Sequence, residues 1–210
     1  MSAEEAKYWR LKDYYENVEL DQIDKVSCRA RSLLCRNMSH AAIESNILNI
    51  TGAIEMMSGM DYHFDNYMRY QSKLHDEEHD PEIHNSLLHE VTAYLNRLGQ
   101  FYYFSQSKFV KNLNINSVAI LPKLNEKILL RHKASAHRSI DAPKKEDDAG
   151  WLPYHAMTFS NMGGYVKDHC GNFVFTISKS SEARVSLNLT IEHSSIIGEA
   201  YSLLQSVLSE

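Results

Sequence analysis

Two consecutive stretches of this chain repeat apolar residues at the three- and four-residue spacing of an amphipathic helix. The first stripe consists of Ile43, Ile47, Ile50, Ile54, Met57, Phe64 and Met68. The second consists of Ile83, Leu87, Val91, Tyr94, Leu98, Phe101 and Phe109. Only a short acidic segment separates the two, so both apolar faces can be buried together if the helices fold back on each other. The sequence therefore predicts an antiparallel helical hairpin. Gly52 and Gly59 lie inside the first stripe and weaken the expectation of an unbroken helix there.

Local start and stop signals support this arrangement. Asp80, Pro81 and Glu82 supply a capping carboxylate, a proline at the first helical position and an acid in the first turn. The second helix is therefore expected to begin there and to continue to about residue 110. Residues 112–117 form a break, and a further helix is expected from Pro122 to about residue 139.

The periodicity changes from helical to alternating after a polar loop at 143–150. Residues 172–178 and 183–191 are rich in β-branched and aromatic residues and predict a hairpin. Residues 192–208 return to helical spacing. The expected fold is mainly α, an antiparallel up-and-down helical bundle with a small C-terminal β-hairpin and a final helix. We divide the chain into an N-terminal helical segment (1–36), the bundle core (37–142) and a C-terminal part (143–210) packed on the same domain.

Composition narrows the class of protein. The chain has 210 residues, of which 43% are hydrophobic, and a net charge of -5, so neither disorder nor a globally basic nucleic-acid-binding protein is expected. Three cysteines without a C-x-x-C pair predict free thiols in a reducing compartment. No signal-peptide pattern and no apolar run of about 18 residues are present, which favours a cytoplasmic protein without a membrane anchor.

One segment departs from the overall acidity. Between residues 123 and 138 there are five Lys or Arg residues and one acid, and His132 and His137 lie among them. An imidazole can act as a general acid or base near neutral pH, and a guanidinium can hold a phosphate as charge develops. With a ribose 2′-hydroxyl as nucleophile, such a set could cleave RNA without a metal. The alternative is a basic helix end that complements the helix dipole.

The segment resembles the signature of the HEPN superfamily, in which an Arg precedes a His by a few residues near a helix end. Here Arg131 and His137 have five residues between them, and the preceding helical hairpin is also similar to the family plan over residues 38–141. The resemblance implies a homodimer whose two Arg131/His137 pairs line a shared cleft for metal-independent RNA cleavage, without a cofactor. It further implies a toxin or defence setting, with an antitoxin as a candidate partner. Residues expected to contact the RNA are His132, Lys133, Arg138 and Lys127.

Helix geometry limits how the pair can act. On an ideal helix, Arg131 and His137 would stand roughly 120° apart and about 9 Å apart along the axis. A joint site therefore needs a reaching arginine, a loosened helix end or a partner chain. The runner-up hypothesis is a non-catalytic HEPN-like module that dimerises or holds a partner.

Two other patterns carry weaker hypotheses. His75 and His79 have the i, i+4 spacing of metal ligands, but the residue after His75 is Asp rather than the Glu of the zincin motif. A solvated acidic turn is the favoured interpretation, with a metal-dependent enzyme as a third class. The aromatic run at 101–104 is expected to belong to the core or to a dimer surface.

Overall fold

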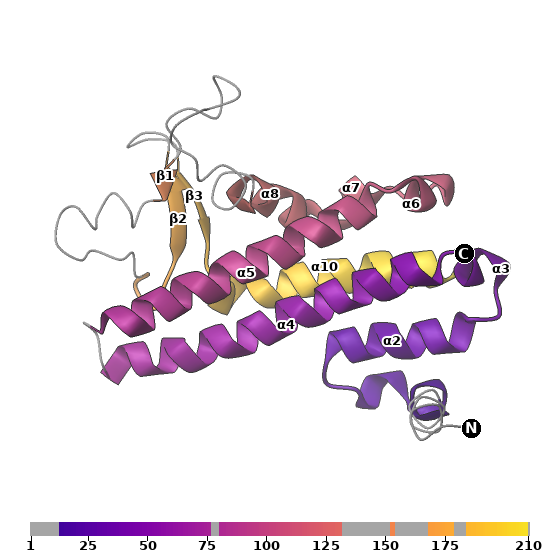
Figure 1. Cartoon of the computed structure of the whole chain (residues 1–210), viewed down its shortest axis with the longest axis horizontal. Coiled ribbons are helices and arrows are strands. Elements are labelled where there is room, and N and C mark those ends of the chain that lie inside the picture. The colour runs from indigo at the N-terminus through magenta and orange to yellow at the C-terminus, as the bar shows by residue number, and fades with distance from the viewer. Residues whose placement is uncertain (1–12, 77–79, 132–151, 154–167, 179–183, 210) are drawn as a thin grey trace.

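A computed structural model describes residues 13–76, 80–131, 152–153, 168–178 and 184–209 (Figure 1). Its longest elements are helices α4 (Ile47–Asp76) and α5 (Pro81–Ser105), which run antiparallel and in contact. The predicted helical hairpin is confirmed. Helix α10 (Leu189–Ser209) packs against both and against α2 (Val26–Asn37), and α8 (Pro122–Arg131) crosses α5 and α10.

The remaining described elements are short. A 3-10 turn (η1, Leu20–Gln22) precedes α2, and α3 (Ala41–Glu44) precedes α4. Helices α6 (Lys108–Asn112) and α7 (Ser117–Ile120) connect α5 to α8. Strands β1 (Leu152–Pro153), β2 (Phe175–Ser178) and β3 (Arg184–Leu187) form an antiparallel sheet in that order. The structure thus confirms the predicted bundle with a small hairpin and a final helix.

Helix α5 begins where the sequence predicted and ends earlier. The carboxylate of Asp80 accepts a hydrogen bond from the Glu82 backbone N–H at 2.8 Å, with Pro81 as the first helical residue. The predicted continuation to about residue 110 is wrong, because α5 ends at Ser105 and the Ser107 hydroxyl caps α6 by accepting from the Val110 N–H. A capping serine competes with the helix ladder for the same donors.

Helix α4 passes both of its glycines without a break. A Cβ at Gly52 would meet nothing within 4 Å, whereas one at Gly59 would lie 2.8 Å from Nε of Arg97. The Arg97 side chain from α5 occupies the space that the missing Cβ leaves. Gly59 is therefore a packing position, and it does not interrupt the helix.

The second predicted strand, 183–191, is too long. Strand β3 ends at Leu187, and α10 begins at Leu189, three residues before the predicted helix start. The Asn188 backbone N–H donates to Glu192 Oε2 at 2.9 Å, so a carboxylate one turn into α10 satisfies the backbone where the helix begins.

Two buried hydrogen bonds attach the segment before β2 to α4. The Tyr67 hydroxyl donates to the Phe173 carbonyl at 2.6 Å, and the Gln71 side chain accepts from the Phe173 N–H at 2.7 Å. Burial raises the pKa of Tyr67 to about 12, which keeps the phenol protonated as a donor. These contacts place the hairpin beside the bundle.

Asp168 attaches the same segment to the start of α10. Its carboxylate accepts from the backbone N–H groups of Cys170 and Asn172 at 2.8 and 2.9 Å and from the Asn188 side chain at 2.7 Å. Hydrogen bonds from Asn172, together with those from Asn188 and Cys170, lower the pKa of Asp168 to about 2.

The core of the described chain lies where α4, α5, α8 and α10 meet. Its fully buried large side chains include Tyr67, Tyr94, Phe101, Phe175, Ile50, Ile54, Met57, Met60, Leu87 and Leu95. Both predicted apolar stripes thus supply the core, with the exception of Ile47, which is only partly buried, and Met68, which is 37% exposed. None of the helices within the described ranges is long and apolar enough to cross a membrane.

Candidate functional site

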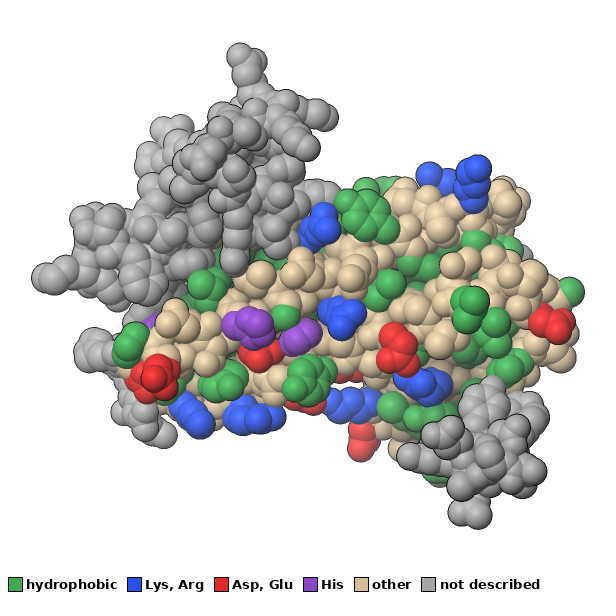
Figure 2. Space-filling view, in the orientation of Figure 1, with side chains coloured by type: hydrophobic (Ala, Val, Ile, Leu, Met, Phe, Trp, Pro, Cys, Tyr) green, Lys and Arg blue, Asp and Glu red, His purple; other side chains and the backbone are tan. Residues whose placement is uncertain are grey.

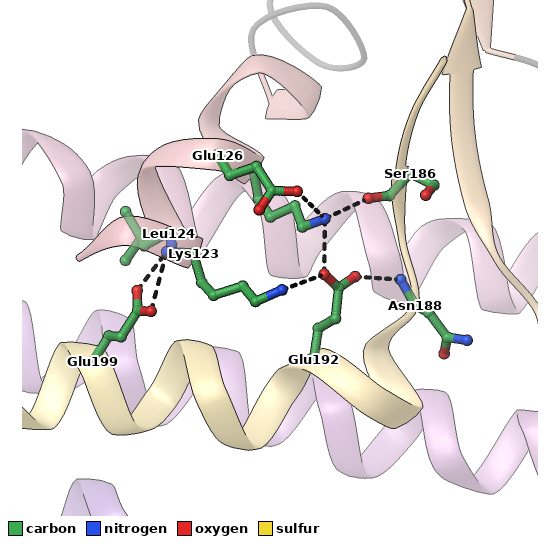
Figure 3. Close-up of polar contacts among 8 residues, drawn as sticks. Lys123, Leu124, Glu126, Ser186, Asn188, Glu192 and Glu199 are labelled. Carbon is green, nitrogen blue, oxygen red and sulfur yellow. Dashed lines mark hydrogen bonds and ion pairs between the residues drawn. The ribbon is translucent and has the colours of Figure 1, made fainter.

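The candidate site begins at the C-terminal end of α8, and α10 fixes that helix at its other end. Glu199 on α10 accepts hydrogen bonds from the Lys123 and Leu124 backbone N–H groups, each at 3.0 Å (Figure 3). A carboxylate at a helix N-terminus satisfies orphan donors and complements the helix dipole. Helix α8 is therefore anchored to α10 in its first turn.

A buried ion pair anchors the middle of α8. The Lys127 ammonium lies 2.8 Å from Glu192 on α10 and 2.9 Å from Glu126, and it donates to the Ser186 carbonyl of β3 at 2.9 Å (Figure 3). Only 4% of Lys127 is exposed. Burial alone would lower its pKa, but the hydrogen bonds to Glu192 and Glu126 outweigh that effect and raise it.

Lys127 was expected from the sequence to contact RNA. Its described contacts instead join α8, α10 and the hairpin inside the domain. This arrangement assigns Lys127 a positioning role, since it holds the helix that ends at Arg131.

Arg131, the last residue of α8, extends over α5. Its side chain lies across Gly99, where an added Cβ would be 2.8 Å from Arg131 Nε and 3.0 Å from its Cγ. Its Cζ stands 5.6 Å from the centre of the Tyr103 ring, and Nη1 donates to the Tyr103 hydroxyl at 3.4 Å. Arg131 is partly exposed. A guanidinium held in this way is pre-positioned at the surface, where it can bind an anion.

The other predicted site residues lie outside the residues that the structure describes. These are His132, Lys133, His137 and Arg138. The distance between Arg131 and His137, on which the predicted catalytic pair depends, therefore remains a prediction. The same holds for the shared cleft of the expected dimer.

Sequence reasoning missed two members of this site, Gly99 and Tyr103. The aromatic run 101–104 was assigned to a core or a dimer surface, and Phe101 and Phe104 are indeed buried, but Tyr103 is 52% exposed. An available signal was its position five residues after a buried Leu98, off the apolar stripe. Nothing in the sequence indicates that the side chain of Arg131, 32 residues later, packs across Gly99.

A second polar cluster lies inside the bundle. His193 on α10 is 3.3 Å from Asp61 on α4 and 3.2 Å from the Tyr94 hydroxyl on α5, and its ring stacks on Phe64 at 3.8 Å. Burial raises the pKa of Tyr94. Because Asp61, Tyr94 and His193 are each at most 8% exposed, the cluster ties three helices together and offers little surface to a substrate.

The His75/His79 hypothesis gains no support from the described residues. His75 lies in the last turn of α4, and His79 lies outside the described ranges. Within those ranges, no group of three or more His, Cys, Asp and Glu side chains is placed to hold a metal ion.

No protein-family model, curated protein or solved structure matches the chain. The functional inference therefore rests on the residues and on the geometry around Arg131.

Proposed function

We propose that the chain is an HEPN-like protein that cleaves RNA without a metal, with Arg131 and His137 as its catalytic residues. The observation that carries this proposal is the fixed position of Arg131. Helix α8 is anchored by Glu199 and Lys127, and its last side chain is held over Gly99 beside Tyr103. A cation that is ordered before substrate arrives can stabilise developing charge without reorganisation.

The reaction is an attack of the ribose 2′-hydroxyl on the adjacent phosphorus. His137 takes the 2′ proton or donates a proton to the departing 5′ oxygen, as a general base or acid. Arg131 stabilises the added negative charge on the phosphoryl oxygens. The bond from phosphorus to the 5′ oxygen breaks, and the products carry a 2′,3′-cyclic phosphate and a 5′-hydroxyl. His132, Lys133 and Arg138 contact the RNA.

The proposal includes a homodimer, because the HEPN resemblance implies a cleft that two chains share and because Arg131 and His137 would stand roughly 120° apart on an ideal helix. In a two-fold dimer each chain can contribute to a cleft that neither forms alone. A toxin or defence role in the cytoplasm, with an antitoxin as partner, belongs to the same proposal.

The test compares purified wild-type protein with Arg131→Lys and His137→Ala variants on mixed RNA in EDTA. Arg131→Lys keeps the charge and loses the planar fork, so a phosphate-binding arginine predicts a clear loss of rate. A wild-type protein inert toward every RNA tried would favour the non-catalytic interaction module. Cleavage that stops in EDTA would favour a metal-dependent enzyme using His75 and His79.

A further inference from the structure

The exposed side of α5 belongs to an almost acid-free part of an acidic chain. Between residues 83 and 125 the only acid is Glu90, while four Lys or Arg residues fall in the same range. Glu90 is 8% exposed and pairs with His63 at 2.8 Å. Figure 2 looks onto α4 and α5 and shows Lys, Arg and His side chains over α5 and at α6, with Asp and Glu side chains also visible on this face. The chain as a whole carries a net charge of -5, so α5 beyond the exposed Glu82 of its first turn is poorer in acids than the rest of the chain.

Arg97 is fixed on one side of this face. Its side chain lies across Gly59 of α4, where an added Cβ would be 2.8 Å from Arg97 Nε. Its Nη1 donates to the Gln100 side chain at 3.2 Å. Both residues are exposed. Arg97 thus packs across a glycine of α4 in the same way that Arg131 packs across a glycine of α5.

Tyr103 lies on the other side of the same face. It is 52% exposed, although Arg131 already lies over its ring. The structure thus places one guanidinium, that of Arg131, beside an exposed aromatic ring, and a second, that of Arg97, six residues earlier on α5. Aromatic rings and guanidinium groups together bind single-stranded nucleic acid in other proteins.

Gln100 lies between Arg97 and Tyr103 on α5, and two hydrogen bonds, Arg97 to Gln100 and Arg131 to Tyr103, link the ends of this row to their neighbours. Arg97, Gln100 and Tyr103 follow one another at three-residue steps, and each step turns by about 60° and rises about 4.5 Å. The row therefore crosses α5 obliquely, from the side of α4 and Gly59 to the side of α8 and Arg131. We call Arg97, Gln100, Tyr103 and Arg131 the α5 band.

We propose that the α5 band binds single-stranded RNA. The choice of RNA as the ligand rests on the proposed function. The two guanidinium groups bind phosphates, an unpaired base stacks on Tyr103, and Gln100 hydrogen bonds to the strand between them. Bases in a duplex are stacked on one another and cannot reach Tyr103, so the band selects unpaired RNA. The strand then reaches Arg131, the end of the band at α8.

The experiment measures RNA binding by the full chain in a His137→Ala background, which separates binding from cleavage. A fluorescent single-stranded RNA of mixed sequence is titrated, and anisotropy gives the Kd at several salt concentrations. Tyr103→Ala is paired with Tyr103→Phe, which keeps the ring. Arg97→Gln is paired with Arg69→Gln, which removes an exposed arginine of α4 that hydrogen bonds to Asn66.

The proposal predicts roughly 10-fold weaker binding for Tyr103→Ala and little change for Tyr103→Phe. Arg97→Gln should reduce the slope of log K against log salt by about 0.7, the value for one phosphate contact on a single strand. Arg69→Gln should leave the slope unchanged, and a duplex of the same sequence should bind more weakly.

Three results would overturn the proposal. The first is a Kd for Tyr103→Ala and Arg97→Gln equal to that of the His137→Ala parent. The others are an equal loss of RNA affinity for Arg69→Gln, or no RNA binding by the parent. The outcome is separable from that of the proposed function. Wild-type protein that cleaves RNA while the band variants bind normally leaves the function and removes the band. Protein that binds RNA through the band but cleaves no RNA would support the band and remove the proposed ribonuclease function.

Discussion

The side chain of Arg131 lies across Gly99 of α5, where a methyl group would stand 2.8 Å from the guanidinium Nε. The two residues are far apart in the sequence, and α5 and α8 reach each other through this contact among others. Gly99 is therefore the position through which the bundle controls the orientation of the proposed catalytic arginine. The same relation between Arg97 and Gly59 indicates that arginine-on-glycine packing is repeated in this fold.

Gly99→Ala is predicted to reduce RNA cleavage by about 10-fold or more, because the new Cβ displaces Arg131. The variant should remain folded, since alanine favours a helix interior over glycine by up to about 1 kcal/mol and offsets part of the steric cost. Cleavage rate and melting temperature are measured together. The matched control is Gly52→Ala, which meets no atom within 4 Å and should keep full activity. Cleavage by Gly99→Ala at the wild-type rate would show that the placement of Arg131 over Gly99 does not affect catalysis.

Lys127→Met is predicted to destabilise the protein by about 3 kcal/mol, because it leaves the Glu192 carboxylate without its nearest cation. Denaturant unfolding followed by circular dichroism measures the change. Lys123→Met is the matched control. Its ammonium is 3.7 Å from the same carboxylate and 43% exposed, so the loss should stay below about 1 kcal/mol. Equal effects of the two substitutions would contradict the positioning role of Lys127.

Lowering the pH is predicted to remove the contribution of Asp168 to the stability of the folded state. Because its folded pKa of about 2 lies below the ordinary value of 3.8, its ionised form stabilises the folded state above about pH 4. That contribution is lost as the pH falls through about 2. Asp168→Asn should therefore be less stable than wild type at neutral pH, and the gap should narrow between pH 4 and pH 2. Thermal unfolding across this range tests the effect, and a gap independent of pH would contradict it.

The proposed dimer is predicted to persist at micromolar concentration. Light scattering of the purified chain should give a mass near twice the 24.2 kDa of one chain. A monomer mass throughout that range, together with retained RNA cleavage, would exclude the shared cleft and require both catalytic groups to come from one chain.

Local patterns predicted most of the helical scaffold. The two apolar stripes and the Asp80-Pro81 start are signals within a few residues of each other, and α4 and α5 follow them. The errors came from short-range competitors. Ser107 starts a new helix where the stripe continued, and Asn188 with Glu192 begins α10 inside the alternating pattern of the second strand.

The candidate site was less accessible to sequence reasoning, because its contacts join distant residues. The spacing to His137 identifies Arg131, but nothing local to Gly99 or Tyr103 indicates that Arg131 contacts them. Lys127 illustrates the opposite problem. In a basic segment it resembles a phosphate ligand, and only the fold brings Glu192, 65 residues later, next to its ammonium.

The roles proposed for Arg131 and His137 are tested most directly by the ratio of the RNA cleavage rates of wild type and His137→Ala in EDTA. General acid–base catalysis by His137 predicts cleavage by the wild type, a loss of about 100-fold or more for His137→Ala, and products ending in a 2′,3′-cyclic phosphate. A His132→Ala control should lose much less. Cleavage by His137→Ala at the wild-type rate would contradict the assignment of His137 as the catalytic histidine.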